Sequence, residues 1–262
     1  MASRGATDLA DIPKVGDAGD VVTDHGLVWQ VMFNGLRMRA GAYYGDWMTE
    51  LIKALKGFHE PQEEKVFHAI LEGLDKPEAM IELGAYWGWY SLWFKHRHPS
   101  AKVIITEPDP ANLAVAASNA MENRLEVALE LGGIGKMDKS QTAGPPLLRF
   151  SDNLLIPSID VESMMEKHGI KTLSILHSDT QGAELHLLHQ VKNLLATRRI
   201  DHLFISTHWQ KIHEQCREVL HGHGYTFVAE HTPEESYTID GLLVARSPML
   251  SPVEIAVSRR QS

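Results

Sequence analysis

From residue 79 onward, short apolar runs alternate with stretches whose apolar residues have helical spacing, and the connections between them are short. Strand–helix alternation of this kind predicts a mostly parallel sheet that is covered by helices on both faces. The last two apolar runs follow each other without a helix between them, which predicts an antiparallel hairpin at one edge. The predicted strands carry the sequences AMIELGAY, AKVIITEPD, LEVALELGGIG, TLSILHSD, HLFISTH, YTFVAEH and DGLLVAR.

The segments outside this pattern are smaller. Residues 1–20 are small, polar and rich in Gly and Asp, so we expect a flexible N-terminal arm. Residues 21–58 contain short alternating runs and an amphipathic helical pattern, which predicts a cap or lid made of a hairpin and a helix. The main α/β domain then covers residues 59–250, and residues 251–262 form a C-terminal tail.

Charge and composition disfavour several classes of protein. The chain carries 25 Lys and Arg against 34 Asp and Glu, a net charge of −9, which is poorly suited to a phosphate backbone. The single cysteine, Cys216, excludes an internal disulfide framework and a thiolate metal cluster. No apolar run approaches the ~18–20 residues of a membrane span, and no signal peptide is evident. We expect a cytoplasmic protein that binds neither nucleic acid nor membrane; a homo-oligomer is compatible with the sequence.

Ligands of open α/β sheets bind beyond the carboxyl ends of the strands, so the last residues of each strand are informative. The first strand ends in Glu82 and runs into a turn with Gly84 and Gly88. Glu107 ends the next strand, 23 residues after Gly84, where an acid can accept hydrogen bonds from both hydroxyls of a ribose. A phosphate-binding glycine loop is missing. The pattern therefore favours S-adenosylmethionine over a dinucleotide.

Asp179 ends the strand TLSILHSD, and His208 ends the strand HLFISTH. Neighbouring strands lie ~4.8 Å apart, so both side chains reach one shared atom if these strands pair. They would then form a general base with its partner, or two ligands of a divalent metal ion. His177, on the same strand face as Asp179, is a third candidate ligand, although a core histidine would give the same pattern. Asp179 or Thr180 also suits a helix N-cap.

At these residues the sequence resembles the FkbM-type methyltransferases, a branch of the S-adenosylmethionine-dependent superfamily. The resemblance runs from HEPQEE at residue 59 to DGLLVAR at residue 240. The first motif, an acid followed by GAxxG, appears at residues 82–88, and EPDP appears at residues 107–110. The motif KxDxEGxE appears as HSDTQGAE at residues 177–184, so His177 and Gln181 depart from the usual pattern.

The resemblance implies a class I methyltransferase fold: a Rossmann-like, seven-stranded, mostly parallel sheet that binds S-adenosyl-L-methionine over its carboxyl edge. It implies that Glu107 holds the ribose, that the turn from Gly84 to Gly88 holds the methionine part, and that Glu60 approaches the amino end. Gly133 and Ile134 would flank the adenine. The cofactor-binding candidates are Glu60, Glu82, Gly84, Ala85, Tyr86, Gly88, Glu107, Pro108, Gly133, Ile134 and Asp179.

Family members mostly methylate oxygen atoms of sugars and natural products, which implies a small-molecule acceptor and a role in natural product biosynthesis. Asp179 and His208 would remove the acceptor's proton, either directly or by holding a cation such as Mg²⁺. Tyr43, Tyr44 and Trp47 are candidates for an aromatic lid over the acceptor, and Gln181 is a further substrate candidate. Two alternatives stay open: a catalytically inactive binding protein of this fold, and a nucleotide-dependent oxidoreductase.

Overall fold

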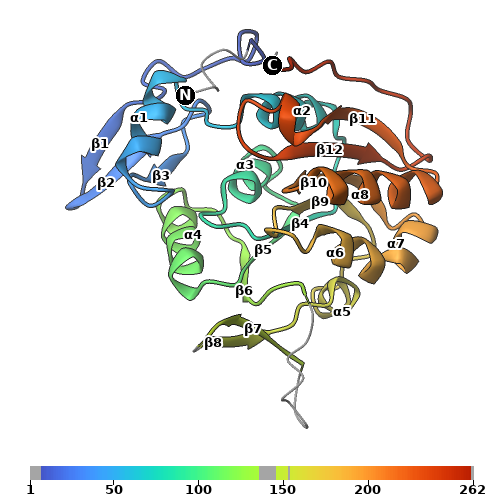
Figure 1. The fold of residues 1–262 in the computed structure, drawn as a ribbon. Helices are drawn as coiled ribbons and strands as arrows, with labels where there is room; N and C mark the ends of the chain where they lie inside the picture. The colour runs from blue at the N-terminus through green and yellow to red at the C-terminus, as the bar shows by residue number, and fades with distance from the viewer. Residues whose placement is uncertain (1–6, 136–145, 153, 261–262) are drawn as a thin grey trace.

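The computed structural model describes residues 7–135, 146–152 and 154–260. Its main feature is a seven-stranded sheet with the strand order β11-β12-β10-β9-β4-β5-β6 (Figure 1). The strands in chain order are β4 (Ala79–Leu83), β5 (Lys102–Glu107), β6 (Ala128–Leu131), β9 (Leu173–Ser178), β10 (Ile200–Thr207), β11 (Thr226–His231) and β12 (Gly241–Arg246).

The strand order places a crevice beside β4. This strand pairs in parallel with β5 on one side and with β9 on the other. The chain runs outward from β4 through β5 to β6, then crosses back to β9 and continues to β10. Such a reversal opens a crevice at the carboxyl ends of the strands. Because β12 is antiparallel to both β10 and β11, the predicted antiparallel edge hairpin is confirmed.

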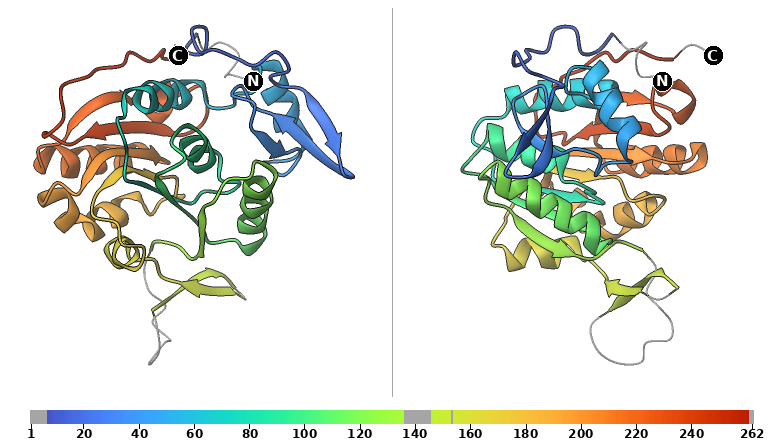
Figure 2. Two further views of the ribbon diagram at one scale, coloured as in Figure 1. Left: turned by 180° about the vertical axis from the view of Figure 1, so that it is seen from behind. Right: turned by 90° about the vertical axis from the view of Figure 1, so that its left-hand side faces the viewer.

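Alternate residues of the strands face two separate hydrophobic cores. On β4, Met80 belongs to the core under one layer of helices and Ile81 to the core under the other. Figure 2 shows the sheet between these two layers, so the predicted α/β architecture is confirmed. One layer contains α2 (Pro61–Gly73), α3 (Trp89–Arg97) and α4 (Pro110–Glu122), and the other contains α5 (Val161–Lys167), α6 (Glu184–Gln190), α7 (Lys192–Ala196) and α8 (Gln210–Gly222).

The N-terminal segment packs beside the main domain. Strands β1 (Val21–Asp24), β2 (Leu27–Val31) and β3 (Arg37–Arg39) form a small antiparallel sheet, and α1 (Asp46–Ala54) follows it. A flexible arm was expected over residues 1–20, but Leu9 and Ile12 are buried in the core. The Asp8 side chain also accepts a hydrogen bond from the backbone N–H of Ser258, 2.9 Å away. Residues 7–20 therefore pack against the domain, because two apolar side chains and a buried acid anchor them.

A separate hairpin projects from the edge of the domain near β6. It consists of β7 (Leu147–Ser151) and β8 (Leu154–Pro157), drawn in olive at the bottom of Figure 1. Each helix in the described part of the chain is too short or too polar to span a membrane.

Candidate functional site

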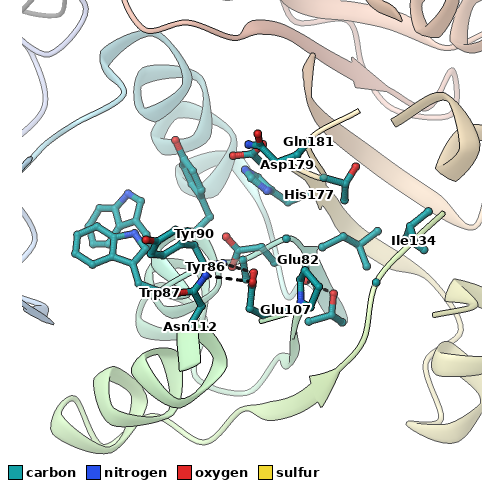
Figure 3. Close-up of a pocket in the computed structure, with 18 of the residues that line it drawn as sticks. Glu82, Tyr86, Trp87, Tyr90, Glu107, Asn112, Ile134, His177, Asp179 and Gln181 are labelled. Carbon is teal, nitrogen blue, oxygen red and sulfur yellow. Dashed lines mark hydrogen bonds between the residues drawn. The ribbon is translucent and has the colours of Figure 1, made fainter. Parts of the chain in front are cut away.

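A pocket of about 420 Å³ opens at the carboxyl ends of β4, β5 and β9 (Figure 3). Its position is the crevice that the strand order predicts. Ligand pockets of ~300–1,000 Å³ are typical for small molecules and cofactors. The lining residues come from the N-terminal segment, from the strand ends and from the β7–β8 hairpin.

The backbone turn after β4 lies directly against the end of β9. Gly84 has a φ of +73°, and a Cβ atom there would lie 1.9 Å from the carbonyl oxygen of Asp179, so only glycine fits. The N–H groups of Gly84 and Ala85 donate to the Thr106 carbonyl at 3.1 and 3.0 Å. Tyr86 follows with a φ of +49°. Contacts with both neighbouring strands therefore fix the turn that lines the pocket.

The carboxylate of Glu107 is held in one orientation at the end of β5. Its Oε2 accepts the N–H of Tyr86 at 2.8 Å, and its Oε1 accepts the N–H of Asp109 at 3.0 Å and Nδ2 of Asn112 at 3.3 Å. Burial raises the pKa of Glu107, and the three donors oppose that shift. Figure 3 shows this carboxylate beside the turn that contains Tyr86. Its pre-set orientation suits the recognition of neighbouring hydroxyl groups.

Small and apolar residues make up the part of the pocket near β6. Gly133 and Ile134 follow β6, and a Cβ atom at Gly133 would lie 3.3 Å from the Ile156 side chain. The hairpin contributes Leu148, Phe150 and Ile156 to the same wall. The hairpin residues were not anticipated from the sequence, because their stretch has no clear strand or helix periodicity. A flat, apolar ring system such as adenine fits a wall of this kind.

Acidic residues gather at the opposite part of the pocket, near the start of α2. The hydroxyl of Tyr90 donates to Oε2 of Glu60 at 2.8 Å, and the same oxygen lies 3.5 Å from Nε2 of His59. Burial raises the pKa of Glu60 to about 8, although the charge of His59 opposes the shift.

His177 is buried in the wall between β9 and α2. Its Nε2–H donates to Oε1 of Glu63 at 2.7 Å, and Glu63 also accepts the Ser206 hydroxyl at 3.2 Å. The imidazole stacks on Tyr90 with 4.4 Å between the ring centroids. Burial lowers the pKa of His177, but the hydrogen bond and charge of Glu63 outweigh burial and raise it to about 9. The ring is therefore an imidazolium at neutral pH.

Asp179 and His208 lie together, as strand pairing between β9 and β10 predicts. Nε2 of His208 lies 3.2 Å from Oδ1 of Asp179 and 3.4 Å from Oδ1 of Asp240, and Nδ1 lies 2.8 Å from Oε1 of Glu184. Burial lowers the pKa of His208, but Asp179 and Glu184 raise it to about 10. His208 is therefore a cation among three carboxyl groups.

Aromatic side chains from the N-terminal segment cover one side of the pocket. Tyr43 stacks on Trp87 with a centroid separation of 4.8 Å and meets Tyr86 edge-on at 5.0 Å. Tyr44 lies 5.3 Å from the Tyr86 ring and is half exposed. Trp47 lies farther out on α1, with 60% of its surface exposed. Tyr43 and Tyr44 thus line the pocket, and Trp47 does not belong to its described lining.

Most residues singled out in the sequence lie on this pocket. Three candidates, Gly88, Trp47 and His208, do not belong to the described lining of the pocket. Gly88 precedes α3 in a left-handed conformation, and Trp47 is at the surface. His208 lies at the end of β10 and contacts Asp179 from there. Asp179 and Thr180 do not cap α6, whose N-cap residue is Ala183. The candidates that line the pocket are Tyr43, Tyr44, Glu60, Glu82, Gly84, Ala85, Tyr86, Glu107, Pro108, Gly133, Ile134, His177, Asp179 and Gln181.

Sequence reasoning missed Glu63 and Asp240, the partners of the two histidines. Asp240 had a usable signal. The last predicted strand, DGLLVAR, was expected to be antiparallel, so its first residue must lie at the edge where the parallel strands end. Gly241 indeed pairs with Thr207. Glu63 had no such signal, because its helix position alone does not show which strand it faces.

The metal-ligand candidates are arranged as ion pairs. No three His, Cys, Asp or Glu side chains within the described ranges are arranged to hold a metal ion. His208 faces carboxylates with both nitrogens, and His177 donates through Nε2 to Glu63.

Comparisons with known proteins agree with this geometry. The family model described as "Methyltransferase FkbM domain" matches residues 79–227, which is more than half of the chain. No curated protein matches the sequence. Among solved structures, the chain is similar to the METTL16 methyltransferase domain at 13% identity and a TM-score of 0.51, over 84% of this chain and 86% of that one. It is also similar to M. capricolum TrmK in complex with S-adenosyl-homocysteine, at 12% identity and a TM-score of 0.45, over 70% and 68% of the two chains.

Proposed function

Because the chain belongs to the FkbM methyltransferase family and has the fold of S-adenosylmethionine-dependent methyltransferases, we propose that it methylates a hydroxyl oxygen of a small molecule, such as a sugar or another natural product. The observation that carries this proposal is the position of two carboxylates on one pocket. Glu107 is the last residue of β5 and Asp179 directly follows β9; these two strands flank β4, and the turn at Gly84 lies between them.

The pocket residues fit S-adenosylmethionine at three points. Glu107 offers an oriented carboxylate for the ribose hydroxyls. Ile134 and the hairpin residues offer an apolar wall for the adenine. Glu60 offers an acidic group for the ammonium of the methionine part. The cofactor would supply an electrophilic methyl group on a sulfonium.

Asp179 is the proposed general base. A hydroxyl group is a poor nucleophile at neutral pH, and a positioned base contributes ~10²–10⁴-fold to the rate. Asp179 lines the pocket, whereas His208, with a pKa of about 10, already carries its proton at neutral pH. His208 therefore acts as a positioning residue that orients the carboxylate of Asp179. The proton of the acceptor hydroxyl moves to Asp179 as the new carbon–oxygen bond forms.

We propose the version of this reaction that needs no divalent cation. A metal-bound imidazole uses a nitrogen lone pair, and both nitrogens of His208 instead face carboxylate oxygens at 2.8–3.4 Å. The positive charge of the His208 imidazolium neutralises Asp179, which is the role that a divalent cation would otherwise have.

The surroundings of the pocket support a small, uncharged acceptor. The net charge of −9 disfavours a nucleic-acid acceptor. Tyr43, Tyr44 and Tyr86 present aromatic rings beside Asp179, and such rings pack well on the apolar faces of sugars.

A panel assay tests the proposal. The protein is incubated with S-adenosylmethionine and single candidate acceptors, including sugars, phenols and amines, and formation of S-adenosylhomocysteine is followed. The proposal predicts turnover with hydroxyl acceptors that disappears in Asp179→Asn. Turnover only with amines, or turnover that Asp179→Asn leaves intact, would contradict it.

A further inference from the structure

The imidazole of His177 has one nitrogen that no contact in the protein explains. Nε2 is committed to Glu63, whereas Nδ1 is buried and has no hydrogen-bond partner among the described residues. The residue as a whole is only 2% exposed. A buried N–H without an acceptor costs ~1–3 kcal/mol, so an unpaired donor at a pocket wall indicates a ligand.

The ring cannot turn away from the pocket without losing its other contacts. It stacks on Tyr90 at 4.4 Å and lies 6.0 Å from the Phe204 ring on the other side. Glu63 holds Nε2, and Glu82 is the register partner of His177 on β4. Figure 3 shows His177 on the pocket wall between Asp179 and Glu82. Nδ1 is therefore a fixed donor.

Positive charge is scarce in this pocket. Of the described lining residues, His59, His177 and Arg149 have side chains that can be cationic. Nδ1 of His59 also has no hydrogen-bond partner among the described residues, but it lies 3.2 Å from Oε1 of Glu64, and Nε2 lies 3.5 Å from Oε2 of Glu60, so both nitrogens face carboxylates. Arg149 lies on the β7–β8 hairpin and donates to the Asp152 carbonyl. A ligand anion bound near β4 and β9 therefore meets one charged donor that is still open, His177.

We propose that Nδ1 of His177 binds the carboxylate of the methionine part of S-adenosylmethionine. This inference rests on the proposed function, because that carboxylate is the anionic group of the cofactor. Glu63 takes part as a positioning residue: its charge keeps the ring doubly protonated, so that Nδ1 carries a hydrogen. Glu60 and Glu82 line the same pocket, and these acidic groups suit the neighbouring ammonium of the same amino acid.

The test combines a protein change with a ligand change. S-adenosylhomocysteine and its decarboxylated analogue, which keeps the amine and lacks only the carboxylate, are titrated calorimetrically into the wild type and His177→Gln. Glutamine can still donate to Glu63 from a position like Nε2 but has no group at the position of Nδ1. His202→Gln is the matched control, because His202 is a buried histidine of β10 outside the pocket's described lining.

We expect His177→Gln to bind S-adenosylhomocysteine at least ~10-fold more weakly and the decarboxylated analogue with unchanged affinity, as for loss of one charge-assisted hydrogen bond. His202→Gln should bind both ligands like the wild type. Equal weakening for both ligands, or no weakening for either, would overturn the assignment. If His177→Gln does not fold, the two ligands are compared on the wild type alone. It must then bind S-adenosylhomocysteine more tightly than the decarboxylated analogue by a similar factor. A wild type that binds neither ligand refutes the proposed function itself.

Discussion

Nε2 of His208 lies 3.2 Å from Oδ1 of Asp179, at the ends of two adjacent parallel strands. From the sequence alone, Asp179 and His208 were both candidates for the base, and the structure distinguishes their positions. Asp179 reaches the pocket, whereas His208 is charged and held from its other side by Glu184, with 2.8 Å between Nδ1 and Oε1. This geometry is the basis on which we propose Asp179 as the base and His208 as the cation that positions it.

Asp179→Asn should reduce turnover by ~10²–10⁴-fold and change the affinity for S-adenosylhomocysteine by less than about threefold. The amide keeps the shape of the side chain but cannot take up the acceptor's proton. Single-turnover rates with an acceptor from the panel, together with calorimetry, measure the two effects. Asp201→Asn, at a half-buried position on β10, is the control. Equal losses of turnover and cofactor affinity would contradict the assigned role.

Glu107→Gln should weaken binding of S-adenosylhomocysteine by ~10–100-fold, because the amide has one acceptor oxygen where the carboxylate has two. The same change loosens the turn at Tyr86, whose N–H donates to Oε2. Calorimetric titration measures the affinity, and Glu166→Gln on the exposed side of α5 should bind like the wild type. An unchanged affinity in Glu107→Gln would show that Glu107 does not bind the ribose.

Gly84→Ala should destabilise the protein by ~3 kcal/mol or more and abolish cofactor binding. The added Cβ would lie 1.9 Å from the carbonyl oxygen of Asp179, and the residue must also keep a φ of +73°. Gly73→Ala is a matched control at the end of α2, because nothing lies within 4 Å of its Cβ position. Urea unfolding compares the two variants. A Gly84→Ala protein as stable as Gly73→Ala would show that the β4–β9 contact is not as close as described.

The ion pairs of His208 should stabilise the folded protein less as the pH rises into the alkaline range. Its folded pKa of about 10 is above the ordinary value of 6.5, so its stabilising contribution is complete below about pH 6.5. The contribution is then lost as pH rises toward 10. The difference in Tm between the wild type and His208→Gln should therefore shrink between pH 6.5 and pH 10. A difference that is constant or grows over this range would show that His208 is not held as a cation.

Chelation should leave turnover unchanged. Both nitrogens of the His208 ring face carboxylate oxygens of Asp179, Asp240 and Glu184, so the ring is already paired within the protein. Turnover with an acceptor from the panel is measured after dialysis against EDTA and again after addition of Mg²⁺. Loss of turnover that Mg²⁺ restores would favour the metal-dependent version.

The sheet could be predicted from the sequence because its strands are apolar runs and because acidic residues mark the strand ends. Glu82, Glu107 and Asp179 each follow an apolar run, so alternation alone placed their side chains at one edge. The antiparallel hairpin was also evident, since no helical pattern separates its two strands. These features are local, and each depends on periodicity within a short segment.

What the sequence did not show depends on contacts between distant segments. The link between His177 and Glu63 spans 114 residues, and no periodicity relates α2 to β9. The hairpin residue Phe150 reaches the pocket from a stretch without a clear pattern. Leu9 and Ile12 pack on the core although their neighbours are small and polar, because two apolar anchors suffice to hold a short segment.

The central claim, that the crevice beside β4 binds S-adenosylmethionine, is tested most directly by calorimetric titration of the wild type with S-adenosylhomocysteine, using NAD as the comparison ligand. We expect one site per chain with a dissociation constant in the range of roughly 1 μM to 1 mM, which is usual for enzyme ligands, and no heat with NAD. No binding of S-adenosylhomocysteine at several millimolar, or binding of NAD in its place, would contradict it.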